Sequence, residues 1–183
     1  MARIATIQKR EDLAPDHQPV YDAIVASRGV VGGPFIGLLH SPELAGRTAH
    51  LGSYVRFESS LDHKLIELAA LATARELDCK HEWIAHVSHA QKDGIPIKTI
   101  RAIHQKKGPE HFSSEDAQVI SYVQELLRTH RASEATFQAL YTRLGEKGLV
   151  ELTATIGYYA MIACTLNAFD LVTASGAEEF KIE

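Results

Sequence analysis

Two adjacent segments, HKLIELAALATAREL (residues 63–77) and DCKHEWIAH (residues 78–86), decide the expected fold. Apolar side chains in the first segment recur three or four positions apart, at Leu65, Leu68, Ala69 and Ala72. This spacing is typical of an α-helix that buries one face. Asp62 and Asp78 stand at the starts of two helical patterns, where aspartate is a favoured capping residue. We therefore expect two consecutive helices, with Cys79 as the first residue of the second.

Prolines, glycines and capping residues divide the rest of the chain into further helices. These are expected at residues 16–27, 42–59, 96–105, 114–129, 134–145 and 149–171. The last is apolar around most of its circumference and should be buried. Residues 29–41 form a glycine-rich apolar loop, and no segment has the alternation of a strand. The expected fold is all-α, a single-domain bundle of about eight helices over residues 1–183, with an N-terminal arm (1–15) and a C-terminal tail (172–183).

Composition excludes several classes of function. The net charge of −4 gives no reason to expect a nucleic-acid partner, and a short basic run is interpreted as a solvated helix face: Lys98, Arg101, Lys106 and Lys107. Residues 1–15 lack the apolar core of a secretory signal, and no segment approaches the roughly 20 apolar residues of a membrane span. The two cysteines, Cys79 and Cys164, do not make a disulfide framework. We expect a soluble, cytoplasmic protein without a membrane or nucleic-acid partner.

An internal similarity links DHKLIELAAL (62–71) to EKGLVELTAT (146–155), and it pairs Glu67 with Glu151. Helical sequences resemble one another by chance, so the alternatives are a coincidence and a duplicated helical hairpin. In a duplicated hairpin, Ala163 and Asp170 would correspond to Cys79 and His86. The second copy would then be scaffold without chemistry.

Polar and reactive residues gather on one face of the second helix. Glu82, Trp83 and His86 follow Cys79 at intervals that place them together. At a helix start, the unpaired N–H groups and the helix dipole would stabilise a Cys79 thiolate. Glu67 lies among apolar residues, where an unpaired carboxylate is costly, and His86 is its obvious partner. The set predicts an acid–base pocket, but each residue alone also fits a structural role: Cys79 and Trp83 in the core, Glu82 and His86 as an exposed pair.

Metal and dithiol chemistry both fit the segment poorly. HEWIAH resembles a zinc motif, yet His81 and His86 are five positions apart, about 140° around a helix, and cannot share an ion in the usual way. Glu82, His86 and His89 would make only a partial site, so we expect no metal. A dithiol cycle needs a second cysteine, and Glu82 occupies the position three residues after Cys79. Cys164 would serve only if the fold brought it close.

The order Glu67, Cys79, EWxxH and His86 resembles the carboxymuconolactone decarboxylase and alkylhydroperoxidase D (AhpD-like) superfamily. The flanking segments GPFIGLLHSPELAGR (33–47), AQKDGIP (90–96) and GLVELTATIGYYAMIACTLNAF (148–169) resemble its decarboxylase-like branch. The resemblance implies an all-helical fold that forms homo-trimers or homo-hexamers, with pockets at or near subunit contacts. The peroxidase branch carries a second cysteine where Glu82 stands, and a histidine that matches His81. The decarboxylase branch acts on a lactone of aromatic-compound catabolism without a cofactor.

The leading hypothesis is a cofactor-independent acid–base enzyme, a carboxymuconolactone decarboxylase-type lyase acting on a small organic acid or lactone. Its catalytic residues would be Glu67, Cys79, Glu82 and His86. His86 would be the acid or base, oriented by Glu67, with Glu82 as a second proton carrier and Cys79 as a polarised thiol. The candidate substrate-binding residues are His40, Arg47, Arg56, His81 and Trp83.

Two alternatives remain, and self-association is expected with any of them. One alternative is an AhpD-like peroxidase (peroxiredoxin) activity of Cys79. The other is a helical binding or assembly module with a decayed site, which a wide separation of Glu67 and His86 or an inert Cys79 would favour. The final helix and residues 30–39 carry more apolar surface than a compact monomer covers easily, so we expect a homo-oligomer.

Overall fold

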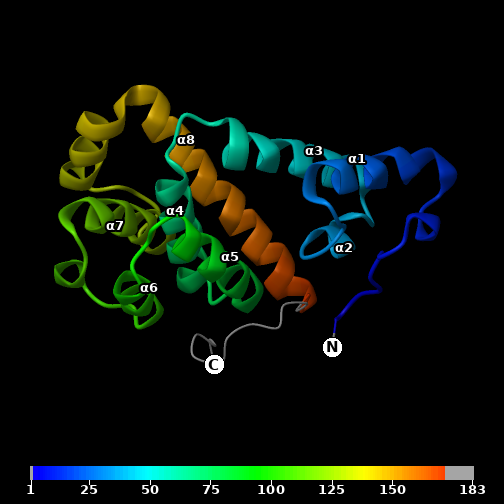
Figure 1. Cartoon of the computed structure of the whole chain (residues 1–183), viewed down its shortest axis with the longest axis horizontal. Coiled ribbons are helices and arrows are strands. Elements are labelled where there is room, and N and C mark those ends of the chain that lie inside the picture. Colours follow the sequence, from blue (N-terminus) through cyan, green and yellow to red (C-terminus); the bar gives the residue numbers. More distant parts are fainter. Residues whose placement is uncertain (1, 172–183) are drawn as a thin grey trace.

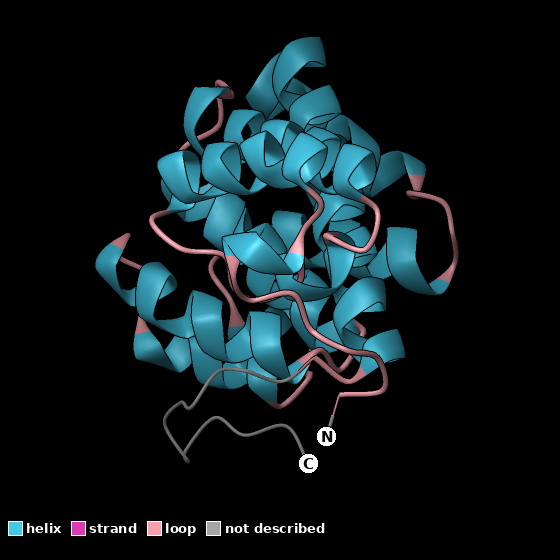
Figure 2. Ribbon diagram, turned by 90° about the vertical axis from the view of Figure 1, so that its right-hand side faces the viewer, coloured by secondary structure: helices cyan, strands magenta, loops and turns pink. Residues whose placement is uncertain are grey.

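Helices make up the whole framework of the computed structural model, which describes residues 2–171 (Figures 1 and 2). The α-helices are α1 Gln18–Arg28, α2 Phe35–Leu38, α3 Pro42–Ser53, α4 His63–Glu76, α5 Lys80–Lys92, α6 Ile97–His104, α7 Ser114–Arg128 and α8 Glu134–Phe169. Short 3₁₀ turns lie at Arg10–Asp12, Pro15–His17 and Pro109–His111, and a π-helical turn, η3, spans Tyr54–Glu58. The described residues contain no strand. The all-α prediction with about eight helices is confirmed.

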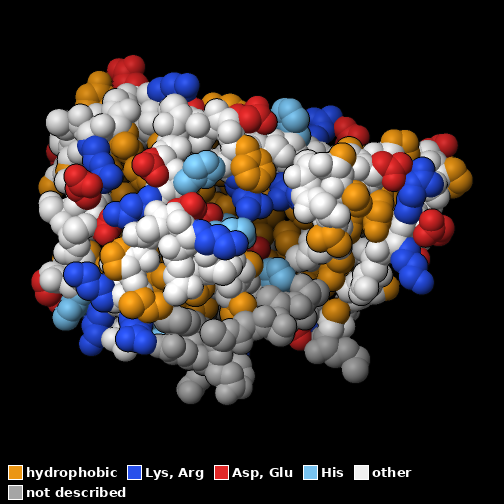
Figure 3. All heavy atoms as spheres, viewed as in Figure 1, with side chains coloured by type: hydrophobic (Ala, Val, Ile, Leu, Met, Phe, Trp, Pro, Cys, Tyr) orange, Lys and Arg blue, Asp and Glu red, His pale blue; other side chains and the backbone are white. Residues whose placement is uncertain are grey.

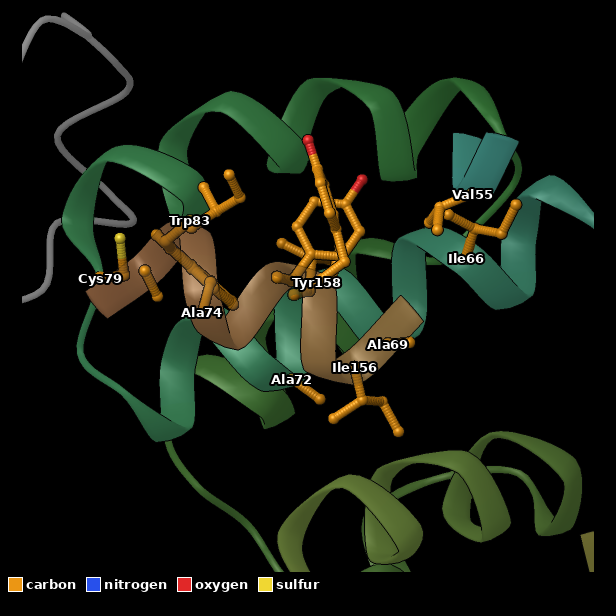
Figure 4. Close-up of a cluster of buried hydrophobic side chains, with 14 of the residues drawn as sticks. Val55, Ile66, Ala69, Ala72, Ala74, Cys79, Trp83, Ile156 and Tyr158 are labelled. Carbon is orange, nitrogen blue, oxygen red and sulfur yellow. The ribbon is translucent and has the colours of Figure 1, made fainter. Parts of the chain in front are cut away.

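Helix α4 lies at the centre of the fold, in contact with α5, α7 and α8. The Asp62 side chain accepts a hydrogen bond from the Lys64 backbone at 2.8 Å, so the predicted cap is present. Every residue from Leu65 to Ala74 is buried, more than the one buried face that the spacing predicts. Its alanines let neighbouring helices approach closely, and Figure 4 shows Ala69, Ala72 and Ala74 within the apolar cluster.

Helix α8 runs diagonally across the molecule and differs from its prediction in two ways (Figure 1). Gly145 has a non-helical backbone (φ 67°, ψ −178°), so the predicted break is present, but the two helical parts meet there without a loop. Burial is one-sided, because Val150 is 68% exposed and Met161 and Phe169 are also exposed. Contrary to the sequence expectation, α8 is long and apolar enough to cross a membrane. However, 56% of its apolar window is buried inside the protein, as in the core helix of a soluble protein.

Three predicted boundaries need correction. Helix α5 begins one residue later than expected, with Cys79 as its N-cap, because Asp78 adopts a left-handed turn conformation (φ 47°). The helix expected up to Ser59 changes at Tyr54 into η3. The expected loop 29–41 contains α2, and within residues 30–39 the apolar side chains are buried except Val30, which is 66% exposed. That segment therefore does not supply the apolar surface expected to drive oligomerisation.

The N-terminal arm packs on the body of the protein. The backbone N–H of Ile7 donates to the Ile36 carbonyl at 2.8 Å, and that of Arg3 donates to the Phe169 carbonyl at 2.9 Å. The predicted tail 172–183 lies outside the described residues. The internal similarity does not extend to a second hairpin. The first copy contains a turn between α4 and α5. At the corresponding position of the second copy there is no turn, because α8 continues as a helix to Phe169.

Glu151, the sequence counterpart of Glu67, ties η3 to α8. Its buried carboxylate accepts hydrogen bonds from the Tyr54 hydroxyl at 2.7 Å and from the backbone N–H and hydroxyl of Ser60 at 2.9 and 2.5 Å. One donor on η3 and two donors on Ser60, just after it, therefore converge on a single side chain of α8. The position of η3, and of any residue on it, depends on this carboxylate.

We predict that Glu151→Ala lowers the free energy of unfolding by about 1.5–3 kcal/mol, the range for hydrogen bonds to a charged group. Urea unfolding measures the loss. Glu58→Ala is the matched control, because Glu58 is exposed on the same turn, and it should change stability by no more than about 0.5 kcal/mol. Equal losses in the two variants would show that the Glu151 contacts do not hold the turn.

Candidate active site

A buried histidine between two buried carboxylates forms the centre of the site. His86 Nδ1 lies 2.7 Å from Glu67 Oε2, and His86 Nε2 lies 3.3 Å from Glu82 Oε2. Glu67 comes from α4, whereas Glu82 and His86 are one turn apart on α5. All three side chains are almost completely buried. The structure thus brings together three of the four predicted catalytic residues.

The two carboxylates hold His86 in its charged form. Burial acts to lower the pKa of His86, but its hydrogen bonds to Glu67 and Glu82 outweigh burial and raise that pKa to about 9. Burial likewise acts to raise the pKa of Glu82, yet the hydrogen bond and charge of His86 bring it below its usual range. At neutral pH the hydrogen-bonded group Glu67–His86–Glu82 therefore contains an imidazolium, with an ionised Glu82 at its Nε2 side.

A pocket of about 260 Å³ opens onto the Glu67–His86–Glu82 group, with Glu82 and His86 in its lining. Its walls come from the end of α1, the segment before α2, η3, α5 and α8. The polar lining comprises Arg28, Arg56, His81, Glu82, His86 and His89, and the bulky apolar and aromatic lining comprises Val30, Phe35, Tyr158, Tyr159 and Ile162. The face seen in Figure 3 is hollowed near its middle, where basic and histidine side chains gather.

Two arginines give the pocket a positive side. Arg28 stacks over the Phe35 ring at 4.6 Å and donates to the Ala49 carbonyl at 3.2 Å. Arg56 projects from η3, and its charge acts on Glu82 and on the tyrosines of α8. Burial lowers the pKa values of His81 and His89, so neither adds a full charge at neutral pH. The pocket can therefore attract a small anion.

Cys79 is not part of the pocket lining, and the predicted thiolate is wrong. Its side chain is fully buried in the apolar cluster near Trp83 (Figure 4). Burial raises the pKa of Cys79 to about 11, although hydrogen bonds from the Glu82 and His81 backbones act in the opposite direction. The sequence interpretation considered the helix start and could not include the apolar cluster around it. Cys79 and Cys164 are both free thiols, and Cys164 is exposed.

The predicted substrate-binding residues divide into two groups. Arg56 and His81 line the pocket, whereas the other three lie outside it. His40 Nε2 is 2.7 Å from the Ala5 carbonyl, and Arg47 forms an exposed ion pair with Glu43. Trp83 is a core residue whose ring packs against His104 at 5.5 Å.

Arg28, Tyr158 and Tyr159 belong to the pocket, and the sequence interpretation missed them. Arg28 ends an ordinary helix, and the tyrosines stand in an apolar stretch that reads as core. His89 was considered only as a metal ligand. Among residues 2–171 no three His, Cys, Asp or Glu side chains are arranged to hold a metal ion. Glu67 and Glu82 direct their oxygens at His86 instead.

Comparison with known proteins agrees with this fold. Residues 42–125 match the model of the carboxymuconolactone decarboxylase family. The chain matches no curated protein in sequence.

Similar solved structures share the fold at low sequence identity. A peroxidase-related AhpD-core protein from Ralstonia eutropha JMP134 has a TM-score of 0.74 at 14% identity, over 98% of this chain and 94% of that one. The debrominase Bmp8, as a variant bound to 2,3,4-tribromopyrrole, has a TM-score of 0.74 at 15% identity, over 96% and 94%. A protein of unknown function from Agrobacterium tumefaciens, related to the antioxidant-defence protein AhpD, has a TM-score of 0.66 at 20% identity, over 76% and 96%.

At these identities the structural similarity establishes the fold, and the family model covers α3 to α7, including the Glu67–His86–Glu82 chain. Residues 42–125 of the chain therefore match the carboxymuconolactone decarboxylase family, within a fold that the chain shares with AhpD-like proteins.

Proposed function

We propose that the protein is a cofactor-independent acid–base enzyme of the carboxymuconolactone decarboxylase type, acting on a small organic acid or lactone. The observation that carries the proposal is His86, held charged between Glu67 and Glu82 at the wall of a pocket. Buried ion pairs in this arrangement are expensive to keep unless they serve a purpose beyond packing.

The three residues have distinct roles in the proposed reaction. His86 holds the proton at neutral pH, and Glu67 fixes the ring through Nδ1 and stabilises its charge. Glu82 lines the pocket and exchanges the proton between His86 Nε2 and the ligand. In a decarboxylation, the carbon that loses CO2 receives this proton. Cys79 takes no part, because its thiol is sealed from the pocket.

The pocket supports a small anionic ligand. Its volume of about 260 Å³ lies below the roughly 300–1,000 Å³ of drug-sized sites. Arg56 and Arg28 offer positive charge to an acid, while Phe35 and Ile162 offer apolar contacts to its body. An organic acid with a small ring or short chain fits both properties.

The two alternatives fit the site less well. A Cys79 peroxidase needs an accessible thiolate, whereas this thiol is buried, protonated and without a cysteine at position 82. A decayed binding module is consistent with the buried thiol. It does not explain why Glu67 and His86 remain paired at 2.7 Å beside an open pocket.

His86→Ala and Glu67→Gln should each lower turnover by about 10²–10⁴-fold, the range for general acid–base catalysis. Cys79→Ser should lower it by less than about tenfold, because no step uses the thiol. Release of labelled CO2 from a panel of carboxyl-labelled lactone acids supplies the assay. Near-normal rates in the first two variants, or complete loss in the third, would contradict the proposed roles.

Stability should depend on pH through His86. Its folded pKa of about 9 exceeds its ordinary value, so its stabilising contribution is complete below about pH 6.5 and is lost as the pH rises through 9. The loss is on the order of 3 kcal/mol between pH 6.5 and 10. Urea unfolding at a series of pH values measures it. In Glu67→Gln the folded pKa of His86 should be lower, so the decline should be smaller and should end at lower pH. Identical curves would refute the coupling.

We also propose that the chain forms a homo-oligomer, a trimer or hexamer as the family resemblance implies. Large apolar side chains are exposed on α3, η3 and α8, among them Leu44, Leu51, Phe57, Val150 and Met161. Light scattering should give three or six times the monomer mass. A monomeric mass at micromolar concentration would contradict the proposal.

A further inference from the structure

The side chain of Tyr159 lies beside His86, and its hydroxyl group has no partner that explains its burial. Its side chain is 3% exposed and lines the pocket, and its ring stands edge-on to His86 with centroids 4.8 Å apart. The hydroxyl oxygen is buried and has no hydrogen-bond partner. An unpaired buried hydroxyl is costly in free energy, so such groups in native proteins call for an explanation.

Other tyrosine hydroxyls in the described part of the chain are satisfied. The Tyr122 hydroxyl is 2.9 Å from Thr153 Oγ1, and the Tyr54 hydroxyl donates to Glu151. The adjacent Tyr158 hydroxyl interacts with Arg28. Tyr159 therefore differs from its neighbours in lacking an acceptor, and it lacks one at the wall of the candidate active site.

The phenol of Tyr159 and the charge of Arg56 are the two groups in the pocket that an anionic oxygen acceptor would use. Arg56 is the cation whose charge acts on the Tyr159 hydroxyl, and it opposes the charges of Glu67 and Glu82. Burial raises the pKa of Tyr159 well above its usual range, so the phenol keeps its proton and acts as a donor. Glu82 and His86 on α5 line the same pocket as Tyr159 on α8, and the His86 and Tyr159 rings are in contact. A ligand in this pocket would therefore lie beside both the phenol of Tyr159 and the proton carrier Glu82.

We propose that the Tyr159 hydroxyl, assisted by the charge of Arg56, donates a hydrogen bond to the ligand carbonyl oxygen on which negative charge develops. This inference rests on the proposed function. When the bond between the ligand carbon and its carboxylate breaks, CO2 leaves and the electron pair moves into the conjugated carbonyl. The carbonyl oxygen becomes an enolate oxygen, stabilised by the phenol. The carbon then takes the proton from the Glu82–His86 pair, which balances the step.

A phenolate that mimics the enolate tests this role. The probe is 4-nitrophenol, whose phenolate form is coloured, so absorbance reports both binding and the pKa of the bound phenol. The wild-type chain should bind the phenolate in preference to the neutral phenol. Tyr159→Phe should weaken phenolate binding by about 10- to 100-fold, the effect of one hydrogen bond to a charged group, and bring the bound pKa back towards that of free 4-nitrophenol.

Tyr122→Phe is the matched control, because it removes a buried hydroxyl away from the pocket and should leave phenolate affinity unchanged. Tyr159→Phe should also keep its Tm, since no partner is lost, whereas Tyr122→Phe loses a hydrogen bond. Equal phenolate affinity in wild type and Tyr159→Phe, or no binding to wild type at millimolar probe, would overturn the inference.

These experiments distinguish a failure of the Tyr159 inference from a failure of the proposed function. If phenolate binding depends on Tyr159 while His86→Ala and Glu67→Gln retain full turnover, the hydrogen-bond role of Tyr159 is supported and the proton-transfer function fails. If those two variants lose turnover but Tyr159→Phe binds the phenolate as tightly as wild type, the function is supported and the Tyr159 inference fails.

Discussion

His86 is held between two carboxylates that have almost no access to water, and this interaction constrains the rest of the structure. Glu67 reaches it from α4 and Glu82 from its own helix, so the bond at 2.7 Å fixes how α4 and α5 face one another. Neither carboxylate would tolerate burial without the shared cation. Because the imidazolium uses both ring nitrogens, a proton can enter or leave only through Glu67 or Glu82, and Glu82 alone of these two lines the pocket.

Glu82 is the residue by which the proposed acid–base enzyme differs from a dithiol peroxidase. In the peroxidase branch, the position of Glu82 carries a second cysteine, according to the family resemblance described above. Here a carboxylate stands there, and Cys79 lies behind it in the apolar core with a pKa of about 11. The histidine and upstream glutamate are present here, so under the proposed function the scaffold carries proton chemistry while the thiol of Cys79 is buried. A shared fold with a debrominase and with AhpD-related proteins is compatible with such a change, since fold does not determine reaction.

The sequence was sufficient for the helices and for the central pair, but not for the pocket. Apolar spacing located α4, and the cost of burying Glu67 among apolar neighbours predicted its contact with His86. The same reasoning failed for Cys79, because helix-start electrostatics is local whereas burial depends on the whole core. Arg28 and Tyr159 lie in distant segments with no polar pattern around them, and only tertiary packing brings them to one wall. Trp83 illustrates the reverse: a residue next to catalytic candidates that faces the core.

The charged state of His86 is the most direct test, and NMR titration of its ring carbon-bound protons measures it without a substrate. With its ring between Glu67 and Glu82, His86 should titrate near pH 9, and Glu82→Gln should lower that midpoint while leaving the fold intact. A midpoint at or below about 6.5, the ordinary value for histidine, would mean that the ring is neutral at physiological pH. In that case His86 could not be the stored proton on which the proposed chemistry depends.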